Sequence, residues 1–353
     1  MSKDNEVIRF HSGIRAHSDL ASSTGVLTSL WIEIPPYCHL YCTYCFANAG
    51  NKVKKVIDNK LELADYERLI TEFAAGGGQY LGIPGLGEPF HPKNEELVRG
   101  IITIADKYKL ETTIFTTGET LFYSKGSEED SEYIKRENDA LVDFIFGKNV
   151  VLMVKCNSLK DRVQDELVGY KGYAAKRNKA LEELIRRGLN SMKTLLGNRR
   201  LGIVTSIMDD NIKDIGMLWQ YADDNDLIFD CDTILPRGRG IAFYRDSHST
   251  EKQYREAIDR VHECAGLHAN PGGTYIGVAC DRVKNHLYVD MRGDVYPCIG
   301  AWGKMKPFGN IKDPNTSISN IWSHNPARKA LRDKRFLVFK NVCNKCENFQ
   351  TET

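Results

Sequence analysis

The feature that most restricts the fold of this chain is a regular alternation of strand-like and helix-like segments. Short apolar or β-branched runs alternate with segments of helical periodicity about six times between residues 30 and 236. Such alternation predicts a parallel sheet joined by right-handed helical crossovers. Six units fall short of the eight in a complete α/β barrel, so a partial barrel and an open sheet both fit. Strands are predicted at residues 30–34, 80–85, 111–116, 149–154, 201–207 and 227–235.

The pattern changes after the segment Pro236-Arg237-Gly238-Arg239-Gly240. A helix is predicted at residues 251–264, and residues 286–296 alternate around Gly293, which indicates a β-hairpin. A charge-dense stretch at residues 124–138 is predicted to be a helix or a solvated insertion. The predicted divisions are an N-terminal extension (1–27), a core (28–240), a linker helix region (241–275) and a small C-terminal domain (276–353).

Composition excludes several classes of function. The 353 residues carry 48 basic and 47 acidic side chains, and the formal charge of +1 offers no basic surface for nucleic acid. No apolar run reaches the roughly 18 residues of a membrane span, and the N-terminus lacks the apolar segment of a secretory signal. We therefore expect a cytoplasmic protein whose partners include neither nucleic acid nor a membrane. Ten cysteines in such a chain favour metal or redox chemistry over disulfides.

Three cysteines, Cys38, Cys42 and Cys45, follow the first predicted strand with CxxxCxxC spacing. Three thiolates on one short loop can bind one face of an iron–sulfur cube and leave the fourth iron open to a substrate or cofactor. The alternative is a zinc site with a fourth ligand elsewhere, such as His39 or His91, because structural zinc takes a closed set of four. The position directly after the first strand favours the cluster.

This motif resembles the signature of the radical S-adenosylmethionine (radical SAM) superfamily, and other segments agree. Gly85-Leu86-Gly87-Glu88-Pro89, after the second strand, is similar to the family's GGE motif, with Leu86 in place of its first glycine. The resemblance implies a partial (β/α)6 barrel of radical SAM type, in the α/β class. It also implies contacts to S-adenosylmethionine (SAM) from residues that follow the strands and the second cysteine: Tyr44, Gly87, Glu88, Thr117, Asn157 and Ser206.

The chemistry implied by the resemblance begins with a [4Fe–4S] cluster on the three cysteines. The reduced cluster passes one electron to SAM, which yields methionine and a 5′-deoxyadenosyl radical that takes a hydrogen atom from an unactivated carbon. The protein contributes orientation and excludes competing reactions. A flavodoxin or ferredoxin is implied as the electron donor.

Four further cysteines, Cys280, Cys298, Cys343 and Cys346, lie in the last quarter of the chain. Four thiolates suit structural zinc or a [4Fe–4S] cluster equally well. The spacing around the predicted hairpin resembles the twitch domain, the shortened form of the SPASM appendage, and this implies a small β-hairpin and helix domain with one auxiliary [4Fe–4S] cluster. The chain ends seven residues after Cys346, so a second auxiliary cluster is not expected.

The sixth predicted strand contains Asp230, Cys231 and Asp232. Side chains alternate along a strand, so the cysteine and the two aspartates face opposite ways. The helix-covered face favours Cys231, which directs the aspartates to the mouth of the barrel, where they bind substrate or act as a base or simply lie at a solvated rim. If the alternation is reversed, Cys231 becomes a candidate hydrogen donor.

The resemblance leaves two enzymatic functions open. The first is dehydrogenation or epimerisation of a sugar, an aminocyclitol or a similar natural-product intermediate. The alternative is epimerisation or crosslinking of a ribosomally synthesised peptide. Only 37 residues precede Cys38, too few for the peptide-recognition domain of many such enzymes, which favours the small molecule. A non-catalytic iron–sulfur or zinc carrier is a third possibility, but it has no need of Gly87 and Glu88.

Overall fold

The centre of the molecule is a sheet of eight strands in the order β10-β9-β1-β2-β3-β6-β7-β8. The computed structural model describes residues 25–50, 58–125, 133–137, 139–235, 237–246, 248–264 and 282–333. Six strands are the predicted parallel ones, and among the described residues the sheet does not close between β8 and β10. They are β1 (Ser29–Ile32), β2 (Tyr80–Ile83), β3 (Glu111–Thr116), β6 (Val150–Lys155), β7 (Leu201–Ile207) and β8 (Ile228–Thr233). The unclosed barrel confirms the predicted partial barrel.

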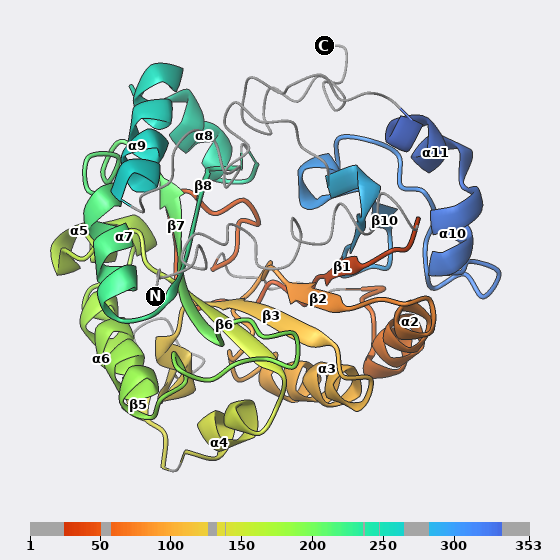
Figure 1. Cartoon of the computed structure of the whole chain (residues 1–353), viewed down its shortest axis with the longest axis horizontal. Coiled ribbons are helices and arrows are strands. Elements are labelled where there is room, and N and C mark those ends of the chain that lie inside the picture. The colour runs from red at the N-terminus through yellow and green to blue at the C-terminus, as the bar shows by residue number, and fades with distance from the viewer. Residues whose placement is uncertain are drawn as a thin grey trace, which may run out of the picture.

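Helices cover the outer face of this sheet (Figure 1). In α2, Tyr66, Leu69, Ile70 and Phe73 recur at helical spacing and are buried against the sheet, as an amphipathic helix requires. β6 is apolar on both faces, because it has helices outside and the barrel interior inside. The crossover helices are α2 (Leu63–Ala75), α3 (Glu95–Lys107), α4 (Ala140–Phe146), α5 (Asp161–Val168), α6 (Tyr173–Arg186) and α7 (Ile215–Asp224).

The charge-dense stretch contains strands where a helix was one of the two predicted alternatives. β4 (Tyr123–Lys125) and β5 (Tyr133–Lys135) pair antiparallel as a separate two-stranded sheet, inserted between β3 and α4 of the barrel order. Strands of three residues are too short to show a period in the sequence, which is why the helix alternative is wrong for them.

The predicted hairpin is confirmed as β9 (His286–Val289) and β10 (Val295–Tyr296), but its position is new. β9 pairs parallel with β1, so the hairpin extends the barrel sheet. The remaining helices are α8 (Gly240–Arg245), α9 (Glu251–Cys264), α10 (Ile318–His324) and α11 (Pro326–Asp333).

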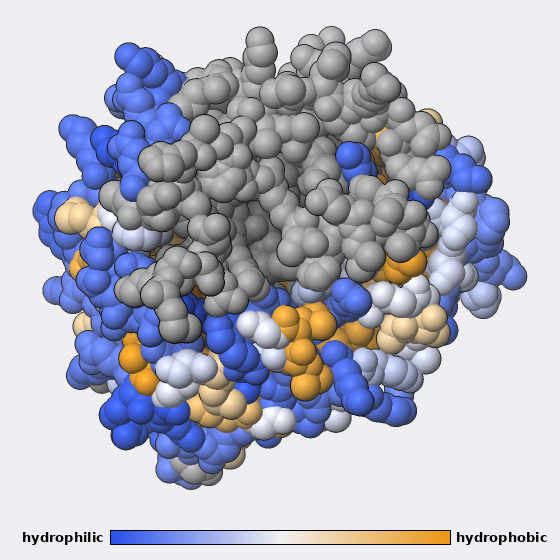
Figure 2. Space-filling model, in the orientation of Figure 1, coloured by the Kyte–Doolittle hydropathy of each residue, from blue (hydrophilic) through white to orange (hydrophobic). Residues whose placement is uncertain are grey.

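The coloured part of the surface in Figure 2 is mostly hydrophilic, with hydrophobic residues in a few patches. Among the described residues, none of the helices combines the length and apolar character needed to cross a membrane.

Gly82 offers a test of the packing inside the barrel. A Cβ at this position of β2 would lie 2.3 Å from a ring carbon of Trp31. We expect Gly82→Ala to lower the free energy of unfolding by about 1–3 kcal/mol, the usual cost of overpacking. Gly216, in α7, has no atom within 4 Å of the added Cβ, so Gly216→Ala is the matched control. It is expected to be neutral or to stabilise by up to about 1 kcal/mol. Urea unfolding followed by circular dichroism measures both, and equal effects would contradict this packing.

Candidate active site

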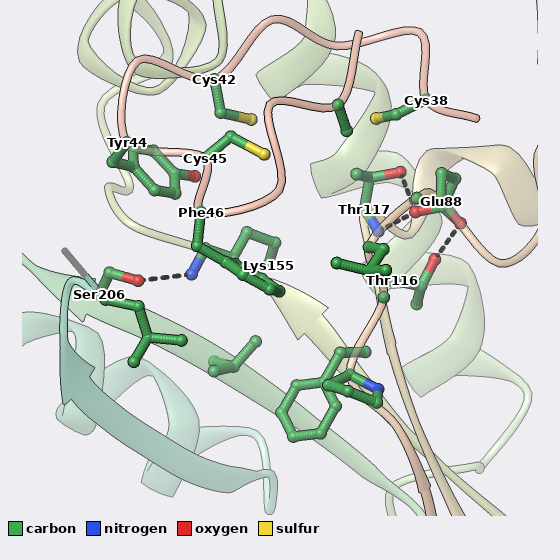
Figure 3. Close-up of a pocket in the computed structure, with 18 of the residues that line it drawn as sticks. Cys38, Cys42, Tyr44, Cys45, Phe46, Glu88, Thr116, Thr117, Lys155 and Ser206 are labelled. Carbon is green, nitrogen blue, oxygen red and sulfur yellow. Dashed lines mark hydrogen bonds between the residues drawn. The ribbon is translucent and has the colours of Figure 1, made fainter. Parts of the chain in front are cut away.

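A cavity of about 250 Å³ lies where the loops after the parallel strands meet. Carboxyl ends of parallel strands share one edge of a sheet, which is where α/β proteins bind ligands. The lining comes from the loop after β1, the Gly85–Glu88 loop and the ends of β3, β6, β7 and β8. Figure 3 shows the principal side chains around this space.

The three cysteines of the N-terminal motif all line this cavity. Their sulfur atoms point into the same space (Figure 3). Hydrogen bonds from the backbone N–H groups of Tyr41 and Thr43 to the carbonyls of Val168 and Leu167, at 2.9 and 3.0 Å, hold the loop against the end of α5. The loop is thus fixed by backbone contacts at its centre, and the thiols remain available to a ligand.

The pKa values of two of these thiols are raised, so both are protonated when no metal is bound. Burial raises the pKa of Cys38 well above its usual range, and burial together with neighbouring Cys45 raises that of Cys42 to about 12. Iron coordination must therefore displace the protons, as is general for thiolate ligands. Among the described residues, no three His, Cys, Asp or Glu side chains converge on a single ion, whereas a cube offers each thiolate a different iron. His39 is engaged elsewhere, since its Nε2 lies 2.5 Å from Oε1 of Glu119.

The Gly85–Glu88 loop is held from both sides. A Cβ on Gly87 would lie 2.4 Å from the Pro35 carbonyl oxygen, so only glycine permits this approach to the loop after β1. The Glu88 carboxylate is buried and accepts hydrogen bonds from three threonine hydroxyls and two backbone N–H groups, at 2.6–3.1 Å. Burial, and then Glu119, raise the pKa of Glu88. The donors are the hydroxyls of Thr116, Thr117 and Thr120 and the N–H groups of Phe90 and Thr117.

A second polar network forms the opposite wall. The Asn157 side chain donates to the Tyr44 hydroxyl at 2.6 Å and accepts from the Ser206 backbone N–H at 2.9 Å. The Lys155 ammonium donates to the Ser206 hydroxyl at 2.8 Å and lies over the Tyr44 ring (Figure 3). Burial lowers the pKa of Lys155 to about 8. Tyr44, Thr117 and Ser206 line the cavity, whereas the buried Asn157 is absent from the lining and fixes the positions of Tyr44 and Ser206.

The acidic strand places its residues on both sides. Asp230 lines the cavity and is buried, and Cys231 packs in the core between the sheet and its helices. The side chain of Asp232 lies outside the described part of the structure. Cys298 is buried beside Ile299, a cavity residue, while Cys280, Cys343 and Cys346 fall outside the described residues.

Two functional candidates carry no recognisable sequence signal. Lys155 ends a continuous apolar strand, and that pattern alone does not show that its ammonium turns into the cavity. Glu33 is fully buried just after β1, where its carboxylate accepts from the Leu86 N–H at 2.7 Å and the Tyr288 hydroxyl at 3.0 Å. It thereby links the Gly85–Glu88 loop to β9.

Comparison with known proteins agrees with this site. A family model described as a 4Fe-4S single cluster domain (Fer4_12) matches residues 22–156, and SPASM, an iron-sulfur cluster-binding domain, matches residues 280–347. A search of curated protein sequences gives no match.

Solved structures share the fold at low sequence identity. Streptococcus suis SuiB bound to S-adenosylmethionine is 15% identical, with 90% of this chain and 71% of that chain covered and a TM-score of 0.63. SuiB bound to precursor peptide SuiA is 15% identical, with 90% of this chain and 70% of that chain covered and a TM-score of 0.62. Native anSMEcpe with bound AdoMet and Cp18Cys peptide is 15% identical, with 91% of this chain and 87% of that chain covered and a TM-score of 0.56.

The three-cysteine loop and Cys298 both lie in segments that match iron–sulfur cluster-binding families. The fold is shared with proteins solved with S-adenosylmethionine bound. The two family matches indicate iron–sulfur clusters as the cofactors of these segments.

Glu33 predicts a specific pH dependence of stability. Burial raises its pKa to about 8 from an ordinary 4.5, so between these values the native state holds a proton that the unfolded state has lost. The stabilisation is complete below about pH 4.5 and is lost as pH rises to about 8. Relative to Glu33→Gln, the wild-type free energy of unfolding should fall by about 3 kcal/mol between about pH 5.5 and about pH 8. Urea unfolding of both proteins across this range tests the shift, and a constant difference would refute it.

Proposed function

We propose that this chain abstracts a hydrogen atom from a carbon of a substrate held in the cavity, with a [4Fe–4S] cluster on Cys38, Cys42 and Cys45. The observation that carries the proposal is that all three thiols line one cavity with the Gly85–Glu88 loop. When bound, SAM and the reduced cluster supply a one-electron cleavage that gives methionine and an oxidant for the C–H bond, recovered as 5′-deoxyadenosine. A flavodoxin or ferredoxin-type protein is the proposed source of the electron.

The chain's own residues orient SAM in this proposal. Gly87 lets the loop backbone approach, and Tyr44, Thr117 and Ser206 present ring and hydroxyl groups from the walls. The polar atoms of Glu88 and Asn157, which are predicted to contact SAM, form hydrogen bonds to neighbouring protein groups. We propose that both are positioning residues, Glu88 for Thr117 and Asn157 for Tyr44 and Ser206.

The cavity lining supports a peptide as the substrate. Besides the polar groups above, much of it is apolar: Trp31, Phe46, Phe115, Leu235 and Ile299. A sugar or aminocyclitol needs several hydrogen-bonding partners, whereas an apolar amino-acid side chain is held by such a surface. The fold shared with SuiB and anSMEcpe, which are known with peptides bound, supports the same substrate class. The proposed reaction is therefore crosslinking or epimerisation of a ribosomally synthesised peptide.

Asp230 favours a second candidate, a small amino- or hydroxyl-bearing substrate. Its carboxylate is in the lining, near enough to Lys155 to act on that ammonium electrostatically. A carboxylate there can bind an ammonium group or act as the base in a dehydrogenation of a sugar or aminocyclitol. Cys231 packs away from the cavity, so its position does not support hydrogen donation in an epimerisation.

The C-terminal region is proposed to hold an auxiliary [4Fe–4S] cluster through Cys280, Cys298, Cys343 and Cys346. The SPASM match covers all four, and Cys298 lies next to the cavity residue Ile299. The domain boundaries at residues 240 and 276 are kept as part of this proposal. Across them, β9 pairs with β1 and continues the barrel sheet.

Cys42 tests the first cluster. We expect Cys42→Ala to abolish SAM cleavage, because two thiols cannot hold the cluster in the cavity. Cys156→Ala is the control, since this buried cysteine lies outside the lining and contacts the Ser158 carbonyl. The measurement is 5′-deoxyadenosine formed by anaerobically reconstituted protein with dithionite and SAM. Retained cleavage in Cys42→Ala would refute the ligand assignment.

Transfer of deuterium from a labelled substrate to 5′-deoxyadenosine distinguishes a peptide substrate from an aminocyclitol. Reconstituted enzyme is supplied with SAM, dithionite and either deuterated short peptides rich in Val, Leu and Phe or a deuterated aminocyclitol. We expect deuterium in 5′-deoxyadenosine from the peptides only, because of the apolar lining. Deuterium from the aminocyclitol alone would reverse the preference and support the second candidate.

A further inference from the structure

The loop after β8 lies directly on the cysteine loop. The Arg239 backbone N–H donates to the Cys45 carbonyl at 3.0 Å. A Cβ at Gly238, whose φ is +54°, would lie 2.7 Å from the carbonyl oxygens of Cys45 and Phe46. Only glycine allows this approach, so the two glycines around Arg239 bring its backbone against the loop that carries Cys42 and Cys45.

The Arg239 side chain holds the same loop at two more points. Its Nε donates to the Cys42 carbonyl and its Nη2 to the Ala49 carbonyl, both at 2.6 Å. The guanidinium also stacks on the Tyr41 ring, 4.0 Å from the centroid. One residue from the far end of the barrel therefore contacts the cysteine loop from residue 41 to residue 49.

The charge of Arg239 is not neutralised by these contacts. Its partners are carbonyls and an aromatic ring, and no described carboxylate forms an ion pair with it. Its Nη1 is buried with no hydrogen-bond partner among the described residues. Lys155, the other cation near Cys42, differs because the Asp230 carboxylate lies close to it. An uncompensated cation away from bulk water acts strongly on a neighbouring charge.

We propose that Arg239 is a positioning residue that also raises the reduction potential of the cluster bound by Cys38, Cys42 and Cys45. Reduction adds one negative charge to the cluster, and a fixed cation beside its ligand loop stabilises that charge. Arg239 thus makes the one-electron reduction that precedes SAM cleavage easier. The inference rests on the proposed ligation of the cluster by these three cysteines.

Arg237 provides a matched control two residues away. It is also a half-buried arginine on an aromatic ring, stacked 3.9 Å from the Trp302 centroid. Its guanidinium packs against Gly303 rather than against the cysteine loop. Arg237→Gln therefore removes the same charge from the same loop without removing a contact to residues 41–49.

The experiment is a potentiometric titration with dithionite of the anaerobically reconstituted full chain, followed by electron paramagnetic resonance. The N-terminal cluster signal is the one absent from Cys42→Ala. In Arg239→Gln with unchanged iron content, we expect the ratio of reduced to oxidised cluster at a fixed potential to fall about tenfold, a shift of about 59 mV for one electron. Arg239→Lys, which keeps the charge, should show less than half of this shift, and Arg237→Gln should show little change.

Three results would overturn the proposal. The first is an unchanged potential in Arg239→Gln with full iron content. The second is an equal shift in the Lys and Gln variants, which would assign the effect to hydrogen-bond geometry. The third is loss of the cluster in both, which would leave Arg239 a purely structural role. If only Arg239→Gln loses the cluster, the potential of Arg239→Lys is the test. A near wild-type potential in Arg239→Lys supports the proposal. A signal that persists in Cys42→Ala would refute the ligand assignment instead.

Discussion

Parallel pairing of β1 on both of its edges is the constraint on which the rest of this structure depends. β1 pairs with β2 on one side and β9 on the other, so Trp31 lies beside both Gly82 and Tyr288. All three strands run the same way, and their carboxyl ends meet at one edge of the sheet. The cysteine loop and the Gly85–Glu88 loop start there, which places them in one cavity although helices and long stretches of chain separate them.

Buried polar groups then turn that shared edge into a shaped site. Glu88 accepts five hydrogen bonds, so its loop is tied to the end of β3, and Asn157 ties the ends of β6 and β7 to Tyr44. In a low-dielectric interior such networks hold their members in one arrangement, because breaking one bond leaves a buried group unsatisfied. The walls of the cavity are therefore fixed by the protein before any ligand contributes.

Local patterns predicted most of the barrel and its cysteine loop, because each strand and the cysteine motif can be recognised within a short stretch of sequence. A strand buried on both faces is continuously apolar, as β6 is, and CxxxCxxC lies within eight residues. Long-range pairing has no such local record. Ser29 and His286 are 257 positions apart, and nothing near either one shows that their strands pair. The partners of Glu33 and Arg239 were hidden for the same reason, although the two glycines beside Arg239 do mark an unusual backbone.

The position of β9 joins the β9–β10 hairpin to the sheet that carries the active-site loops. Glu33 accepts hydrogen bonds from Leu86 in the Gly85–Glu88 loop and from Tyr288 in β9, and Tyr288 is packed with Trp302 and Tyr296. Moving either segment alone would break a hydrogen bond to a fully buried carboxyl group, a loss of about 1–3 kcal/mol. The Gly85–Glu88 loop and the hairpin that leads to Cys298 are therefore held in one fixed relation.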